Sequence, residues 1–374
     1  MRAISPRTLP LLLLLALVAP VASQAPQSYQ ESDFLTRIRR LTVDGKRAGE
    51  GYWSPDGKRL VFQSEREPGN PFYQIYTLDL ATGDSTRVST GIGKTTCSFF
   101  RPGSDDIMFA STHADPKSKQ LQDEELAFRA SGKERRYSWD YDPEMDIYSV
   151  NEKTGAMKRL TTARGYDAEG SYSPDGQWIV FSSMRDAYNR PLNAKEKKML
   201  EENPSYFAEI YIMRADGSGQ TRLTNVPGYD GGPFFTPDGR ILWRRFDESG
   251  LLADVWIMNR DGTNQKQLTD FGSMSWAPYM HPSGQYIIFA SNKLGFDNFE
   301  LFMVDAQGTK EPVRVTYSDG FDSLPVPSPD GKTLAWTSSR SGGAAGQLFL
   351  AQWNHEKALE AIRNAPLKKA SRKK

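Results

Sequence analysis

The sequence has one cysteine and only three histidines among its 374 residues. A single cysteine, Cys97, excludes an intramolecular disulfide, so the fold must be stabilised by its own core. The sequence also lacks a His-Glu-x-x-His motif, a Gly-x-Ser-x-Gly elbow and a glycine-rich phosphate loop. We therefore expect no catalytic residues and no required cofactor. Cys97 lies beside Phe99 and Phe100, which favours a small buried side chain over a reactive thiol.

An excess of charge of one sign is missing as well, because 47 Lys and Arg stand against 46 Asp and Glu. Without a net positive field, binding to nucleic acid or to an anionic membrane is not expected.

Long apolar runs are absent except near the start of the chain, where one extends over residues 9–22. Arg2 and Arg7 precede it and small polar residues follow, which is typical of a secretory signal peptide and too short to span a bilayer comfortably. We expect a signal peptide over residues 1–23, a mature chain without a transmembrane span, and a periplasmic or secreted protein. An uncleaved anchor is the alternative.

A short turn of the type Ser-Pro-Asp-Gly is repeated along the chain. Proline presets φ at its second position, and glycine takes the positive φ that a tight hairpin requires. The copies lie at residues 54–57, 173–176, 236–239 and 328–331, with looser ones at 101–104 and 281–284. Three of the five spacings are 45 to 47 residues, the length of one four-stranded unit, and the other two are a unit with an insertion.

Six such units predict an all-β fold, a six-bladed β-propeller of four-stranded antiparallel blades over residues 34–353. The last unit lacks its fourth strand, whereas residues 34–42 carry the Arg-Leu-Thr ending of one. We therefore expect this N-terminal strand to close the ring. Residues 354–364 are predicted to form a short C-terminal helix, and residues 365–374 a basic disordered tail.

Both insertions are predicted to lie on the same face of the propeller. Residues 112–143 and 185–206 each follow the second strand of a unit, whereas the short turns lie on the opposite face. The second insertion contains a predicted helix over residues 194–202. Because rigid scaffolds carry function on their loops, we expect a partner to bind the loop-rich face.

Charged residues recur at fixed places on that face. In three units an aspartate lies six residues before the first residue of the Ser-Pro-Asp-Gly-type turn. These residues are Asp167, Asp230 and Asp322. The loops after the second strands add Arg66, Arg185, Arg245 and Arg340. Either each aspartate caps its loop or pairs with the neighbouring blade's arginine, or the aspartates form a ring at the channel mouth that binds a cation or a basic group of a partner. Repetition with the blade favours the structural interpretation.

Two further features of the face leave alternatives open. Asp140, Asp142 and Asp146 are closely spaced but depart from an EF-hand loop, so a calcium site at the first two is a weak candidate. Trp139 and Trp276 are expected in loops, where an indole ring can stack on a sugar or a peptide or pack into the core.

The Ser-Pro-Asp-Gly hairpins, the Ile-Tyr-Ile-Met strand and the Arg-Leu-Thr endings resemble the repeats of the TolB-like propeller family over residues 36–353. The resemblance implies a periplasmic propeller that binds a partner. Similar repeats form the non-catalytic propellers of prolyl-oligopeptidase-like enzymes and occur in oligogalacturonate lyase. The segment between residues 23 and 33 is expected to be too short for the α/β domain that precedes the propeller in TolB.

These observations predict a monomeric, non-catalytic propeller that binds an envelope protein, a peptide or an envelope glycan through its loop-rich face. The alternative is a metal-dependent propeller lyase or hydrolase that acts on polysaccharide. The low number of histidines argues against that alternative.

Overall fold

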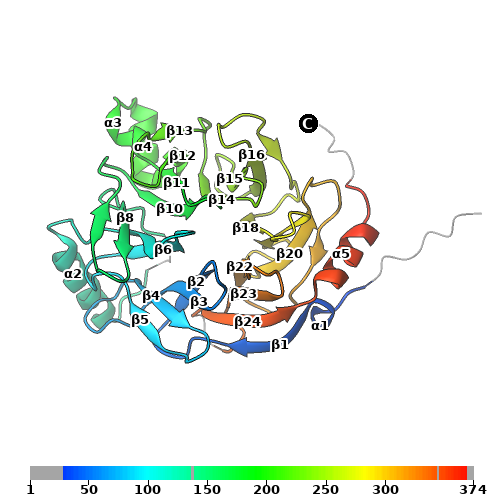
Figure 1. The fold of residues 1–374 in the computed structure, drawn as a ribbon. Helices are drawn as coiled ribbons and strands as arrows, with labels where there is room; N and C mark the ends of the chain where they lie inside the picture. The colour runs from blue at the N-terminus through cyan, green and yellow to red at the C-terminus, as the bar shows by residue number, and fades with distance from the viewer. Residues whose placement is uncertain (1–27, 136–138, 343–344, 369–374) are drawn as a thin grey trace, which may run out of the picture.

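The computed structural model describes residues 28–135, 139–342 and 345–368. Within these ranges, six four-stranded antiparallel sheets are arranged as blades around a central axis (Figure 1). The predicted six-bladed β-propeller is confirmed.

The strands of each blade run in chain order from the central axis outward, apart from the last strand of blade six. Blade one contains β2 (Ala48–Trp53), β3 (Arg59–Ser64), β4 (Gln74–Asp79) and β5 (Ser85–Arg87). Blade two contains β6 (Thr95–Phe100), β7 (Asp106–Ser111), β8 (Asp146–Asn151) and β9 (Met157–Arg159). Blade three contains β10 (Asp167–Tyr172), β11 (Trp178–Ser183), β12 (Glu209–Arg214) and β13 (Thr221–Arg222). Blade four contains β14 (Asp230–Phe235), β15 (Ile241–Phe246), β16 (Ala253–Met258) and β17 (Lys266–Gln267). Blade five contains β18 (Ser275–Met280), β19 (Tyr286–Ser291), β20 (Glu300–Asp305) and β21 (Val313–Arg314). Blade six contains β22 (Asp322–Pro327), β23 (Thr333–Ser338), β24 (Gln347–Trp353) and β1 (Leu35–Arg40).

The ring is closed by its first strand, as predicted. Strand β1 pairs antiparallel with β24, with Leu35 opposite Trp353 and Arg40 opposite Phe349. Figure 1 shows this N-terminal strand lying along the outer edge of the C-terminal blade. The pairing covers the edge that an open ring would leave exposed.

The repeated sequence motifs are explained by repeated hydrogen bonds. In the hairpin turns the serine hydroxyl donates to the aspartate, as Ser54 does to Asp56 over 2.6 Å. In the Arg-Leu-Thr ending, Arg222 donates to the carbonyl oxygen of Thr224 over 2.6 Å and to the carboxylate of Glu209 over 2.6 Å. These motifs therefore hold the strands of each blade in place.

Every innermost strand contains a β-bulge between its second and fifth residues. The third residue of each of these strands has a positive φ, between 48° and 58°. These six bulge residues are Glu50, Cys97, Glu169, Gly232, Ala277 and Leu324. A bulge leaves one residue outside the ladder, so the third residue is released from the side-chain alternation of the strand.

The two insertions lie in blades two and three. The first contains α2 (Ser118–Ala130), and the second contains α3 (Asp186–Asn189), α4 (Ala194–Glu202) and the 3-10 helix η1 (Pro204–Phe207). Helix α4 has the predicted bounds, and it begins at a capping box in which Asn193 and Glu196 each accept a hydrogen bond of 2.9 Å from the other's backbone amide.

The two ends of the described chain lie beside blades five and six. Helix α1 (Glu31–Phe34) contacts α5 (His355–Asn364) on the outside of the ring (Figure 1). Of the predicted tail, the described residues contact blade five, because the Lys368 backbone amide donates to the Thr309 carbonyl oxygen over 2.8 Å. The Lys368 ammonium group also lies 2.8 Å from Asp270, in the loop that follows blade four. The predicted signal peptide and residues 369–374 of the tail lie outside the described residues.

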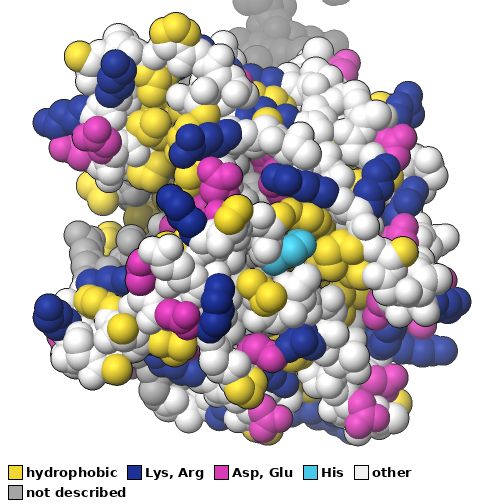
Figure 2. All heavy atoms as spheres, turned by 90° about the vertical axis from the view of Figure 1, so that its left-hand side faces the viewer, with side chains coloured by type: hydrophobic (Ala, Val, Ile, Leu, Met, Phe, Trp, Pro, Cys, Tyr) yellow, Lys and Arg dark blue, Asp and Glu magenta, His cyan; other side chains and the backbone are white. Residues whose placement is uncertain are grey.

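Figure 2 shows one side of the ring with basic and acidic side chains interspersed, in agreement with the balanced composition. Among the residues that the structure describes, no helix is long and apolar enough to cross a membrane.

Candidate functional site

The central channel is closed by aromatic side chains two residues beyond the bulge. Tyr52, Phe99, Phe234 and Tyr279 occupy this position in four blades. The rings of Tyr52 and Phe234, from the opposite blades one and four, lie 5.5 Å apart between centroids. Phe234 also lies 5.0 Å from Tyr279. These contacts across the axis block the channel toward the short-turn face.

Above this aromatic floor lies a pocket of about 930 Å³, which we call the central pocket. All six bulge residues line it, as do Tyr52 and Phe234 of the floor. The first insertion contributes Trp139 and Tyr141 to the wall, and the second contributes Tyr206. The central pocket therefore belongs to the loop-rich face, and both insertions help to form it.

One wall of the pocket carries a buried ion pair. Arg244 donates to Glu169 over 3.0 Å and to the Tyr229 hydroxyl over 2.5 Å, and Tyr229 in turn donates to Glu169. The backbone amide of Gly232 donates to the second carboxylate oxygen of Glu169 over 2.6 Å. Both Glu169 oxygens are thus occupied by protein donors.

The glycine at the fourth bulge makes this ion pair possible. A Cβ atom at Gly232 would lie 1.8 Å from Nη1 of Arg244. Arg244 stands opposite Gly231 on the neighbouring strand, so its side chain occupies the space that a bulge side chain fills in other blades. Blade four therefore presents an arginine from its second strand at the pocket.

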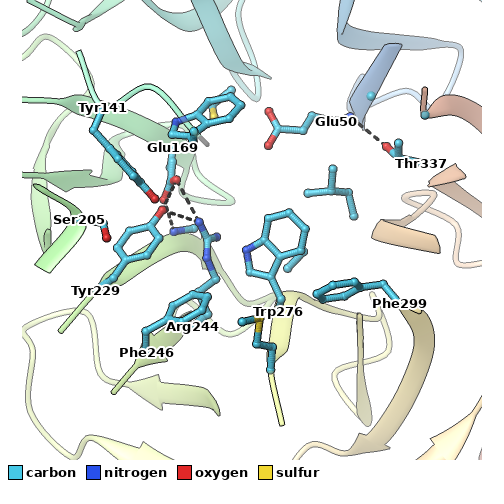
Figure 3. A pocket seen from close by; sticks show the side chains of 18 of the residues that line it. Glu50, Tyr141, Glu169, Ser205, Tyr229, Arg244, Phe246, Trp276, Phe299 and Thr337 are labelled. Carbon is cyan, nitrogen blue, oxygen red and sulfur yellow. Dashed lines mark hydrogen bonds and ion pairs between the residues drawn. The ribbon is translucent and has the colours of Figure 1, made fainter. Parts of the chain in front are cut away.

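A second carboxyl group enters the pocket from blade one. Figure 3 shows the Glu50 carboxyl directed into the cavity from the side of Thr337. Its Oε2 atom is buried and has no hydrogen-bond partner among the described residues. Burial, with a smaller contribution from the charge of Glu169, raises the pKa of Glu50 to about 7.

The remaining wall is aromatic. Trp276 lies 6.0 Å from Phe299 and 6.1 Å from Phe321 between ring centroids, and all three line the pocket. The guanidinium of Arg244 lies 5.5 Å from the Trp276 ring and 4.9 Å from the Tyr229 ring. A ligand would meet a few charged groups and a broad apolar surface.

The three predicted aspartates do not line this pocket. Asp167, Asp230 and Asp322 begin their strands and are buried. Each accepts an ion pair from its own blade, at 2.6 Å from Arg185, 2.7 Å from Arg245 and 2.7 Å from Arg340. The arginine is therefore not the neighbouring blade's, because antiparallel pairing sets the end of the second strand beside the start of the first, as with Asp230 opposite Arg245.

The fourth predicted arginine, Arg66, has no ion-pair partner among the residues that the structure describes. Blade one carries Ala48 where blades three, four and six carry aspartate, and Arg66 instead donates to Ser64 over 2.9 Å. Its guanidinium lies 4.9 Å from the Tyr76 ring.

The weak metal candidates Asp140 and Asp142 both contact the Lys94 ammonium group, Asp142 at 2.7 Å. In the part of the chain that the structure describes, no three His, Cys, Asp or Glu side chains are grouped so that they could hold a metal ion.

Both predicted tryptophans line the central pocket. Trp139 donates its Nε1 hydrogen to the Tyr166 hydroxyl over 3.0 Å, which fixes its ring. Trp276 was expected in a loop but is the second residue of β18.

Sequence reasoning missed the pocket residues Glu50, Glu169 and Arg244. A signal for the first two exists, because each lies four residues before a turn serine, at Ser54 and Ser173. That position corresponds to the bulge in every blade. No such signal marks Arg244, whose place depends on the glycine of the adjacent strand.

Comparison with known proteins supports the fold. No family model matches the chain. An uncharacterised protein of Agrobacterium fabrum, Atu1656, is 28% identical over 215 residues, which are 52% of this chain and 64% of that protein. The uncharacterised peptidase YuxL of Bacillus subtilis is 28% identical over 153 residues, 37% of this chain and 22% of that protein. The chain thus covers less than two thirds of the length of either relative.

Solved structures share the propeller architecture. A TolB candidate from Agrobacterium tumefaciens superposes with a TM-score of 0.57 at 20% identity, covering 85% of this chain and 96% of that one. TolB from Acinetobacter baumannii gives 0.52 at 17% identity, covering 83% and 64%. An oligogalacturonate lyase in complex with manganese gives 0.52 at 16% identity, covering 89% and 97%. At these identities the likeness shows a TolB-like propeller fold.

Proposed function

We propose that the protein is a secreted or periplasmic binding propeller that receives its ligand in the central pocket from the loop-rich face. The observation that carries this proposal is the pocket itself, which is closed below by aromatic rings and bordered above by both insertions. Its size is within the range of ligand sites, and its wall combines aromatic rings with a few charged groups. The segment over residues 1–23, with its signal-like order of charge and apolar residues, supports export.

The mode of action is binding without turnover, with a protein, peptide or envelope glycan as the partner. A metal-dependent lyase or hydrolase needs a group of metal ligands, and no observation among the described residues favours one. The Asp-Arg pairs of blades three, four and six belong to the scaffold that holds the pocket.

A thermal-shift and calorimetry screen tests the proposal. The panel consists of peptide pools, peptidoglycan fragments and oligouronates, each with and without divalent metal ions. We expect at least one class to raise the melting temperature of the wild type, because a ligand that binds only the folded state stabilises it. Trp276→Ala should abolish that shift, since Trp276 lines the pocket.

Trp178→Ala is the matched control. Trp178 is a half-buried tryptophan at the start of β11, beside the short turn of blade three, where it contacts Arg214 and Arg260. Retention of the shift in this variant shows that the pocket is the site. A ligand that protects both variants equally, or turnover of a glycan that depends on added metal, would refute the proposal.

A further inference from the structure

Among the described charged side chains that line the central pocket, Glu50 and Asp247 have no ion-pair partner, and of these two only Glu50 is buried, since Asp247 is exposed. Arg244 is paired with Glu169, and Arg47, which also lines the pocket, donates to Glu65 over 2.8 Å. Asp247, at the rim, accepts from the hydroxyl of Ser249 in its own loop. No ion pair within the described chain involves Glu50.

Within the described chain, the donors to the Glu50 carboxyl are uncharged and come from one residue. Cys97, the bulge residue of the next blade, provides its thiol and its backbone amide. Thr337 is not a donor to the carboxyl, since its hydroxyl accepts from the Glu50 backbone amide over 3.2 Å. A buried carboxyl with an unpartnered oxygen costs stability unless a ligand supplies the missing donor.

The pocket also contains an unpartnered donor. The Nε atom of Arg244 is buried and has no acceptor among the described residues. An occupant that satisfies both residues carries a cationic donor for Glu50 and an acceptor oxygen for Arg244. The first residue of a peptide has both, in its ammonium group and its carbonyl oxygen.

The closed floor restricts how such a ligand enters. Tyr52, Phe99 and Phe234 contact one another below the bulge residues, so a chain cannot thread through the axis. Glu50 lies two residues before Tyr52 on the same innermost strand, which places it just above this floor. A polymer therefore reaches Glu50 with its end.

We propose that the central pocket receives the amino terminus of a peptide, whose ammonium group binds the Glu50 carboxylate. This inference rests on the proposed binding function and names its ligand. The first side chain of the peptide packs against Trp276 and Phe299, which face Glu50 across the cavity in Figure 3.

Other chain ends fit the pocket less well. A carboxyl terminus would meet Glu50, while the cation of Arg244 is already paired with Glu169. A neutral sugar end would leave the Glu50 charge without a counter-charge in a desolvated site. The amino terminus is the end whose charge complements that of Glu50.

The test uses the full chain and two pools of randomised hexapeptide amides, one with free amino termini and one acetylated. Peptides that remain with the protein after gel filtration are counted by mass spectrometry at pH 7.5. We expect the wild type to retain the free pool at least about tenfold better than the acetylated pool, because acetylation removes the ammonium group. The comparison of the two pools is made on the wild-type protein, so it does not depend on whether a variant folds.

Glu50→Gln should reduce the ratio between the pools to about one while the protein stays folded, because the amide keeps the shape of the carboxyl. Glu356→Gln is the matched control, since Glu356 is exposed on α5 outside the ring, and it should keep the wild-type ratio.

Retention should also depend on pH. Besides Glu50, the titratable groups around the site are Cys97, Glu169, Arg244 and Tyr52. Burial raises the pKa values of Cys97 and Tyr52 well above their usual range, whereas that of Glu50 is raised to about 7. Binding an ammonium group requires ionised Glu50 and releases its proton, so retention of the free pool should be about eightfold lower at pH 6 than at pH 7.5.

Three results overturn this inference. Equal retention of both pools by the wild type, with loss in Trp276→Ala, would leave the binding pocket but exclude recognition of the ammonium group. An unchanged ratio in Glu50→Gln would exclude Glu50 as its partner. Retention of neither pool would exclude a peptide ligand, and the proposed function would then depend on the glycan members of the thermal-shift panel.

Discussion

Two sets of acidic side chains lie on the innermost strands of this propeller, and they differ in position by only two residues. The first set, Asp167, Asp230 and Asp322, begins its strands and is paired with arginines of the same blade. The second set, Glu50 and Glu169, occupies the bulge position and lines the central pocket. Neighbouring positions on the same strand thus serve the scaffold in one case and the pocket in the other.

The difference follows from the bulge. A regular strand would direct its first and third side chains to the same side of the sheet. The bulge breaks this alternation, so the third residue lies at the channel while the first stays within its blade. Acids repeated with the blade therefore stabilise it, whereas the pocket is formed at a position whose residue changes from blade to blade.

The largest expected effect is on the scaffold set. Asp167→Ala leaves Arg185 buried without its carboxylate partner, since the Asp167 side chain is fully buried and that of Arg185 is 10% exposed. We expect the free energy of unfolding to fall by about 3–5 kcal/mol, measured by urea denaturation. A loss below about 1 kcal/mol would show that the scaffold role is wrong.

For the pocket set, we expect the ionised carboxylate of Glu50 to destabilise the folded state. The pKa of Glu50 is raised from 4.5 to about 7 by burial, so between these values the folded state binds more protons than the unfolded state. The free energy of unfolding should therefore decrease as the pH rises from 4.5 to 7, by up to about 3 kcal/mol from this group. Urea denaturation at several pH values should show this component in the wild type and not in Glu50→Gln. Identical pH profiles of the two proteins would contradict it.

A third substitution separates backbone strain from the pocket ion pair. Gly232→Ala adds a Cβ that displaces Arg244, and it should destabilise the protein by about 2–3 kcal/mol and abolish ligand binding. Gly239→Ala is the matched control, because Gly239 has a φ of 81° but a Cβ atom added there would have no neighbour within 4 Å. It should cost about 1 kcal/mol and leave binding intact, as judged by denaturation and calorimetry.

The smallest effect is expected where the scaffold pair is missing. Arg66→Ala should lower the free energy of unfolding by less than about 1 kcal/mol, because blade one has Ala48 in place of the aspartate and Arg66 forms no ion pair with a described residue. Comparison with Arg185→Ala by urea denaturation measures the contribution of the aspartate partner. Equal losses in the two variants would remove the distinction between blades.

The sequence predicted much of the fold and part of the site. The turns counted the blades, and the Arg-Leu-Thr ending at Leu41 and Thr42 identified the strand that closes the ring. Trp139 and Trp276 were selected from their place on the loop-rich face, and both line the pocket. These features are local, so they are visible in a short stretch of sequence.

The sequence pattern does not distinguish the carboxyl groups that line the pocket from those that form ion pairs within a blade. Asp167 and Glu169 stand two residues apart, and the strand pattern gives no sign that a left-handed residue lies between Ala168 and Ser171. The regular recurrence of Asp167, Asp230 and Asp322 attracted attention to residues that form ion pairs within their blades.

The sequence by itself determined the number of blades, the closing strand and the face that carries the insertions, because turns and strand patterns depend on residues close together in the chain. Only the tertiary structure decided which charged groups share the central pocket. Glu50, Glu169 and Arg244 come from blades one, three and four, and they meet because ring closure brings the bulges to one axis. Their proximity depends on the geometry of the whole ring, and the sequence of a single repeat does not specify that geometry.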